Sequence, residues 1–127
     1  MNDSILVSIK KLLGLTEEDT SFDTDLIIHI NSVFFMLNQL GVGSERVFSI
    51  TDSSTEWTDF IHDVSEYSLI KSYMFLKVKL MFDPPNSSSV LDCYKAQITE
   101  YEWRINVMRE NLSLIHISEP TRQAEIS

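Results

Sequence analysis

Hydrophobic and polar positions alternate with the period of an α-helix in four separate segments of this chain. Residues 3–13 begin with Asp3 or Ser4 as a cap and are followed by Gly14, a residue typical of helix ends. Residues 24–40 carry a stripe of apolar side chains at spacings of four and three. Further apolar side chains widen this stripe, so we expect a helix buried on more than one side, with another subunit covering its far side.

Two more helices are predicted in the second half of the chain. Residues 66–82 carry a third apolar stripe, and Asp83-Pro84-Pro85 ends it, because proline lacks an amide hydrogen and disfavours helical geometry in the preceding residue. Ser87, Ser88 and Ser89 then offer caps to a last helix. Its apolar residues repeat at spacings of three and four: Leu91, Tyr94, Ile98, Tyr101, Ile105 and Met108. A seam of this length is more typical of a helix packed on its own domain than of a coiled coil.

The segment between the second and third of these helices has a different character. Residues 41–56 are predicted to form a long loop with a short extended piece at 47–50. Thr55 is the expected cap of a brief helix through Trp57 and Phe60. The pattern therefore predicts an all-α protein, a small bundle of about four helices with one long loop between the second and third long helices.

Length and composition narrow the class of protein. The 127 residues, 43% of them hydrophobic, suffice for one domain with its own core. Cys93 is the one cysteine, so no disulfide forms within the chain. No apolar run approaches the ~20 residues that span a bilayer, and the N-terminus lacks the basic region of a signal peptide. We therefore expect a soluble protein that is made in the cytoplasm and does not bind membranes.

The charge is acidic and unevenly distributed. The chain has 10 basic and 19 acidic side chains, a net charge of −9. Residues 1–66 account for that whole excess, whereas residues 67–111 are almost neutral. Such a surface does not grip DNA, which requires clustered Lys and Arg. It indicates either solvated faces with helix caps or a molecule whose unlike ends suit head-to-tail or ring assembly.

The sequence contains no set of residues with the spacing of a catalytic or metal site. Asp19, Asp23 and Asp25 lack the glycine that a calcium loop needs after its third ligand, and helix capping explains them better. The three histidines are far apart, without a second ligand at zinc spacing. No base accompanies Cys93, which we interpret as a helix-surface or buried thiol. We therefore expect no catalytic residue, no metal and no cofactor.

Four segments carry a more specific pattern: SILVSIKKLLG at 4–14, DTDLIIHINS at 23–32, LNQLG at 37–41 and KVKLMFDPP at 77–85. In this order, and with YEWRIN at 101–106, they resemble the small head–tail connector proteins of tailed bacteriophages and prophages. The resemblance covers about residues 4–110. It implies a helical, non-enzymatic virion protein that forms a ring between portal and tail, completes the head and extends the DNA channel.

The end of the chain departs from this pattern. LSLIHISEPTR at 112–122 resembles translated sequencing-adapter read-through, and Pro120 is expected to end any helix there. We therefore predict a connector domain at residues 1–111 and a non-native or disordered tail at 112–127.

The resemblance also implies partners: other copies of this chain, a portal protein and a tail-side adaptor or stopper, all at the head–tail junction. A ring needs two different adhesive patches on each subunit. Aromatic groups dominate both protein cores and interfaces. We therefore expect the core and interface anchors to come from one pool of aromatic residues: Phe34, Phe35, Tyr73, Phe75 and Trp103.

A second group of candidates is acidic. Asp52, Glu56 and Asp59 are the expected channel or partner surface, where like charge lets DNA pass without sticking. A different interpretation of the same charge is an acidic helical regulator, or DNA mimic, that binds a DNA-binding protein. The two differ in assembly, since a mimic acts as a monomer or dimer.

Overall fold

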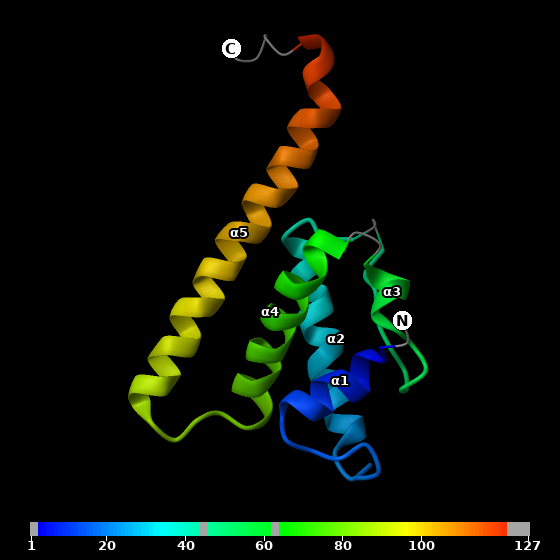
Figure 1. Ribbon diagram of the computed structural model, residues 1–127, viewed down its shortest axis with the longest axis vertical. Helices are drawn as coiled ribbons and strands as arrows, with labels where there is room; N and C mark the ends of the chain where they lie inside the picture. The colour runs from blue at the N-terminus through cyan, green and yellow to red at the C-terminus, as the bar shows by residue number, and fades with distance from the viewer. Residues whose placement is uncertain (1–2, 44–45, 62–63, 122–127) are drawn as a thin grey trace.

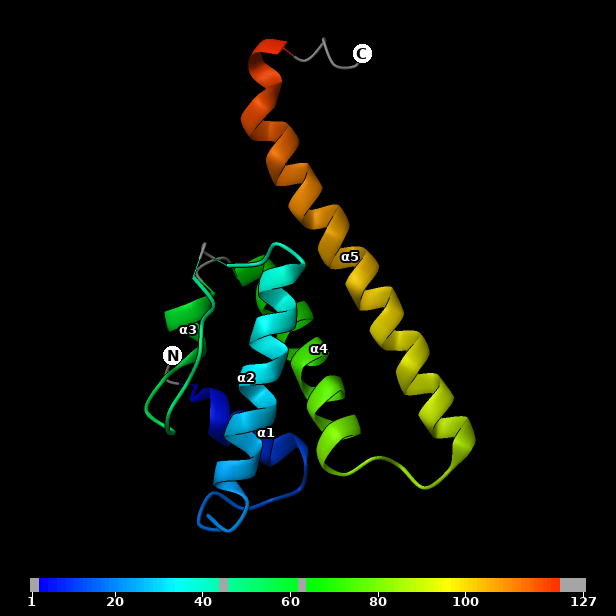
Figure 2. The ribbon, with the colours of Figure 1, turned by 180° about the vertical axis from the view of Figure 1, so that it is seen from behind.

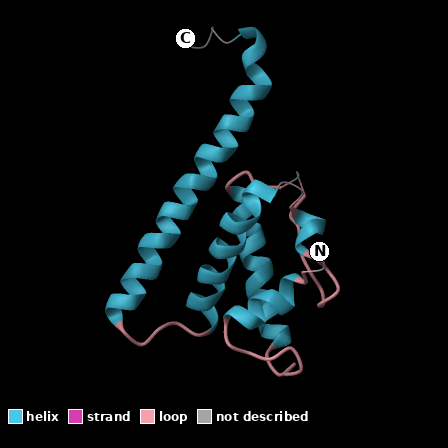
Figure 3. Ribbon diagram, viewed as in Figure 1, coloured by secondary structure: helices cyan, strands magenta, loops and turns pink. Residues whose placement is uncertain are grey.

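The computed structural model describes residues 3–43, 46–61 and 64–121. It contains α1 (Ile5–Leu12), α2 (Asp23–Gln39), α3 (Trp57–Phe60), α4 (Val64–Phe82) and α5 (Ser88–Thr121) (Figure 1). These residues include helices and loops but no strand (Figure 3). The prediction of a small all-α bundle is confirmed. Four longer helices form it, and α3 is the brief helix expected through Trp57 and Phe60.

The helix ends follow the capping pattern of the sequence. The Ser4 hydroxyl accepts a hydrogen bond from the Val7 N–H at 3.2 Å and so caps α1. At the end of α2, Gly41 has φ of +92°, and the Val42 N–H returns to the Leu37 carbonyl at 2.9 Å. Glycine takes this left-handed conformation without steric cost, which explains why the helix stops here.

α4 lies at the centre of the bundle, between α2 and α5 (Figures 1 and 2). Its buried side chains face two neighbours, so they occupy more than one stripe: Ile70, Tyr73, Met74, Leu76 and Val78. Val78 is also fully buried. It lies seven residues after Lys71, which reaches Asp3, whereas Tyr73 bonds to Glu102 of α5, so different neighbours bury different sides of α4.

The predicted seam of α5 packs on α4 within the same molecule. Ile98 and Ile105 are buried there, and Tyr94 and Tyr101 are half-buried against the core. The helix then continues obliquely beyond the other helices (Figure 2). Its backbone remains helical to Thr121, past the expected boundary at residue 111 and one residue past Pro120. The domain boundary at 111 stays a prediction.

The long loop folds back over α1 and α2. The Ile5 N–H donates to the Thr55 carbonyl and the Trp57 N–H to the Asp3 carbonyl, both at 3.0 Å. Residues 47–50 belong to this loop and form no strand, so the short extended piece suggested by the sequence stays a prediction. The cap of α3 is Glu56 and not Thr55, because the helix begins one residue later, after Glu56 pairs with the start of α1.

Candidate interaction surfaces

The five aromatic candidates occupy different environments. Phe34 and Tyr73 are buried in the core, and Phe75 is half-buried against it. Phe35 and Trp103 are exposed by 51% and 63%. The structure thus divides the pool into two core residues, one intermediate residue and two that are available to a partner.

Phe34 anchors the long loop to α2. Its ring lies 5.0 Å from that of Phe48 and 4.8 Å from that of Phe60, centroid to centroid, in edge-on arrangements. Phe48 and Phe60 are themselves 5.0 Å apart. The three rings join α2, the loop and α3, so Phe34 stabilises the subunit itself.

Tyr73 connects α4 with α5. Its hydroxyl donates a hydrogen bond of 2.8 Å to Glu102 Oε2. Burial, and after it the hydrogen bond to this carboxylate, raises the pKa of Tyr73 well above its ordinary value, so the phenol remains a donor. Lys77 Nζ lies 5.9 Å from the centre of the Tyr73 ring. This cluster fixes α5 on the central helix.

The outer face of α2 carries two large apolar side chains that the described part of the chain leaves more than half exposed. Ile28 and Phe35 lie two turns apart on the side opposite the buried stripe, and Ile28 is exposed by 57%. Ser32 lies between them and donates a hydrogen bond to the Ile28 carbonyl at 3.1 Å. Asp25 is exposed at the beginning of the same face. We call this surface, Asp25, Ile28, Ser32 and Phe35, the α2 outer face.

The corresponding side of α5 carries Trp103. Thr99 and Ala96 are exposed one and two turns before Trp103, respectively, on the side away from α4. Lys95 is exposed beside them. We call these four residues the α5 outer face. On its edge, Arg104 donates to Glu100 Oε2 at 2.6 Å, an exposed pair that contributes little to stability.

The acidic candidates all make local hydrogen bonds. Asp52 Oδ1 accepts from the Ser54 N–H at 2.9 Å, and bonding to Ser54 holds the pKa of Asp52 below its ordinary value. Glu56 and Asp59 form the capping box of α3, with the Glu56 N–H donating to Asp59 Oδ2 at 2.8 Å. Asp52 and Asp59 remain exposed, so they combine a structural role with an accessible charge.

Two further polar clusters were not apparent from the sequence. Lys10 is 2% exposed, and its Nζ lies 2.9 Å from Asp23 Oδ1 while donating to the Glu17 carbonyl at 3.1 Å. This cluster closes the loop between α1 and α2. The acidic start of α2 suggested only a dipole interaction, and nothing in the spacing of Lys10 and Asp23 indicated that they pair.

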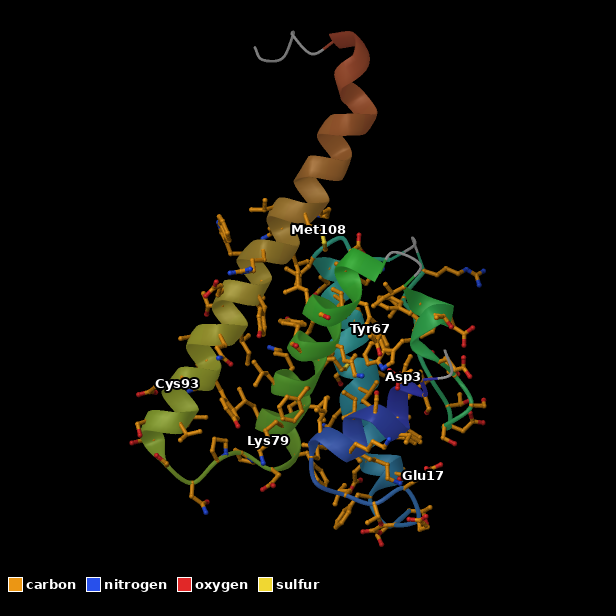
Figure 4. All side chains as sticks on the ribbon, viewed as in Figure 1. Asp3, Glu17, Tyr67, Lys79, Cys93 and Met108 are labelled. Carbon is orange, nitrogen blue, oxygen red and sulfur yellow. The ribbon has the colours of Figure 1, made fainter. Side chains whose placement is uncertain are left out.

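The second cluster joins the start of α1 to α4, where Asp3 and Tyr67 lie side by side (Figure 4). Tyr67 donates to the Asp3 carboxylate, and Lys71 Nζ lies 3.1 Å from Asp3 Oδ2. Burial opposes ionisation of Asp3, but the hydrogen bonds from Tyr67 and Lys71 outweigh it and lower the pKa of Asp3. The four-residue spacing of Tyr67 and Lys71 was a usable signal, because it places both on one side of a helix.

The described residues offer little for metal chemistry. They include no group of three or more His, Cys, Asp or Glu side chains arranged to hold a metal ion. His29 packs edge-on against Phe82, with ring centroids 6.5 Å apart, whereas His62 lies outside the described residues. Cys93 is exposed near the start of α5 (Figure 4). No helix in the described part of the chain has the length and apolarity to cross a membrane.

The fold and its surfaces define a small helical protein in which the two most exposed aromatic groups among the described side chains, Phe35 and Trp103, lie on the outer faces of two different helices. Residues 5–112 match the family model described as phage connector protein, and the chain belongs to this family of structural head–tail connector proteins of bacteriophages. The resemblance noted in the sequence is confirmed. No curated protein and no solved structure matches the chain.

Proposed function

We propose that this protein assembles as a homo-oligomeric ring between the portal and the tail, where it completes the head and extends the DNA channel. The match of residues 5–112 to the phage connector family carries the proposal. The proposed partners are other copies of the chain, the portal protein and a tail-side adaptor or stopper. The role is structural, in the virion, without an enzymatic step, a cofactor or membrane binding.

The distribution of exposed aromatic groups supports a ring. A ring repeats one heterologous contact, so each subunit must present two unlike patches that lie on different sides. The α2 and α5 outer faces meet this requirement, because α4 separates the two helices (Figure 1). Trp103 and Phe35 are each more than half exposed, and such groups commonly dominate the energy of an interface.

The acidic surface is compatible with DNA that passes through without binding. Residues 1–66 carry the entire net charge of −9, and Asp52 and Asp59 are exposed. Carboxylates near the channel repel phosphates over ~8 Å at physiological salt. The proposed channel or partner surface therefore contains Asp52, Glu56 and Asp59.

Electron microscopy of the full chain mixed with portal assemblies from the same phage tests this function. We expect an added ring of density on the portal, in register with its axis, and portal alone provides the control. If the chain did not bind the portal but bound a phage repressor stoichiometrically, the result would instead support an acidic regulator.

A further inference from the structure

We propose that Trp103 of one subunit packs on the α2 outer face of the next subunit, against Phe35 and Ile28. The contact rests on the proposed ring and identifies the two faces that form its repeated interface. The occupant of the α2 outer face is therefore a second copy of this chain.

Among the described side chains, the largest exposed apolar groups of α2 and α5 lie on these two faces. Ile28 and Phe35 lie opposite the α2 side chains that pack in the core, and Trp103 lies opposite the α5 seam on α4. Within one subunit both faces point away from α4, so they cannot meet each other. A second copy brings an α5 face to an α2 face and leaves the opposite faces open for further copies.

The direction of the helices fixes how the two faces meet. α2 and α5 run in the same direction within the subunit, whereas α4 runs in the opposite direction (Figures 1 and 2). Neighbours in a ring of many subunits differ by only a small rotation. The α5 of one subunit therefore runs in the same sense as the α2 of the next, and the two helices cross at the tilt that Figures 1 and 2 show between them.

Helices that run in the same sense bring complementary side chains together around the Trp103 contact. Phe35 and Ile28 are seven residues apart, as are Trp103 and Ala96. When Trp103 lies beside Phe35, Ala96 lies beside Ile28, so a small side chain faces a large one at that level. Ser32 then faces Thr99, which pairs polar groups between the two apolar levels.

Charge supports the same register. Lys95 lies eight residues before Trp103, and Asp25 lies ten residues before Phe35. With a rise of about 1.5 Å per residue, the two charges come within ~3 Å of the same level and on the same side of the contact. Both side chains are exposed, and α2 contains no Lys or Arg of its own. An ion pair between Lys95 and Asp25 thus accompanies the contact of Trp103 with Phe35.

Site-specific cross-linking tests this register. Thr24, exposed on α2, is eleven residues before Phe35, and the native Cys93 is ten before Trp103, so the proposal places them at nearly the same level. The variant T24C/C93S is mixed with wild-type chain on portal assemblies and treated with a short bismaleimide. We expect a covalent pair, at a yield about tenfold above that of a matched S68C/C93S variant, because proximity raises the effective concentration. Neither chain alone should give the product.

A substitution provides the energetic test. Trp103→Ala should raise the concentration for half-maximal ring assembly by about tenfold or more, as expected for a central aromatic anchor. Its thermal unfolding should stay close to wild type, because the indole is 63% exposed in the subunit. Val90→Ala is the matched control, since Val90 is also exposed on α5 but lies outside the α5 outer face.

The outcomes separate this contact from the ring itself. The contact would be overturned if rings formed normally but positions 24 and 93 gave no link and Trp103→Ala assembled like wild type. The proposed function would then remain intact. Failure of the wild-type chain to form any assembly, alone or on portals, would overturn both. A link between two Cys93 residues in the wild type would indicate a two-fold contact and also overturn the proposal.

Discussion

The side-chain amide of Asn31 makes both backbone hydrogen bonds of Ile50. It donates to the Ile50 carbonyl at 2.9 Å and accepts from the Ile50 N–H at 2.8 Å. One side chain of α2 thereby takes the place of a neighbouring strand for a loop residue that is almost completely buried. The bonds hold Phe48 close to Phe34 and fix the long loop against the helix.

Replacement of Asn31 by Ala should therefore destabilise the subunit strongly. Two backbone groups of a buried residue lose their partners, which we expect to cost about 2–4 kcal/mol. Urea unfolding followed by circular dichroism measures the change. Gln39→Ala, at an exposed position of the same helix, should change the free energy of unfolding by less than about 0.5 kcal/mol. Equal effects of both substitutions would contradict the role of Asn31.

Lys10→Met should lower the free energy of unfolding by about 2 kcal/mol, because it removes the buried partner of an ion pair and leaves the partly exposed Asp23 uncompensated. The methionine side chain retains most of the volume, so the loss reports on the charge. Lys11→Met, exposed one residue later, is the control. The double variant K10M/D23N should recover part of the loss, and a purely additive result would show that the pair is not coupled.

Gly41→Ala should destabilise the protein more than Gly14→Ala. Both glycines have positive φ, of +92° and +85°, so both substitutions carry the same backbone penalty of about 1 kcal/mol. A Cβ at Gly41 would also lie 1.9 Å from Arg109 Cδ, whereas a Cβ at Gly14 meets no atom within 4 Å.

The difference between these two variants therefore measures the contact of α5 with the end of α2. It should largely disappear in an Arg109→Ala background, where that side chain no longer obstructs the new Cβ. Thermal unfolding of the four variants provides the measurement. A difference that persists without Arg109 would show that backbone conformation alone distinguishes the two glycines.

The cluster of Asp3, Tyr67 and Lys71 predicts two limbs in the dependence of stability on pH. The folded-state pKa of Asp3 lies below its ordinary 3.8, so its contribution is present above that pH and is lost as pH falls through the folded pKa. The pKa of Lys71 lies above its ordinary 10.5, because bonds to Tyr67 and Asp3 outweigh burial. Its contribution is present below that pH and is lost as pH rises through the folded pKa.

Asp3→Asn should therefore reduce the loss of stability below about pH 4 relative to wild type. It should also reduce the alkaline loss of stability, because Lys71 then lacks its carboxylate partner and its folded-state pKa returns toward the ordinary value. Unfolding free energies measured from pH 2 to 11 check both limbs. If the loss of stability at low pH were the same in Asp3→Asn as in wild type, that loss would come from other carboxylates.

The triple variant D52N/E56Q/D59N tests the proposed acidic surface. Amide oxygens replace the carboxylates as acceptors in the capping box of α3, so helical content should be retained. If these charges keep DNA from sticking, particles with the variant should release DNA more slowly at low salt, and the difference should vanish at high salt. If DNA release were unchanged at all salt concentrations, the role of these three residues would be limited to stabilising the loop and α3.

Several features of the fold follow from local sequence signals. Gly14 and Gly41 end the first two helices, and Asp83-Pro84-Pro85 ends α4, because these residues act through their own backbone geometry. The seam of α5 also follows from spacing alone. Such signals require no knowledge of which segments meet. They predicted the helices to within a few residues except for the end of α5, which continues to Thr121.

The remaining features depend on contacts between distant segments. The bonds of Asn31 to Ile50 and of the Trp57 indole N–H to Ser8 Oγ at 2.8 Å join residues far apart in the chain. The aromatic pool is a different case. Phe34 lies four residues after Ile30 and three before Leu37, on the stripe that packs in the core, whereas Phe35 lies on the opposite side of α2, so helical spacing was a usable signal for this pair.

The central position of α4 has a consequence for the geometry of assembly. In the proposed ring, α2 of each subunit contacts α5 of its neighbour, so the angle that α4 sets between these two helices is the wedge angle of the subunit. The bond between Tyr73 and Glu102 holds α5 at that angle. In such a ring, the packing of α4 against its two neighbours sets the number of subunits. A change in the tilt of α5 would change that number and so widen or narrow the channel.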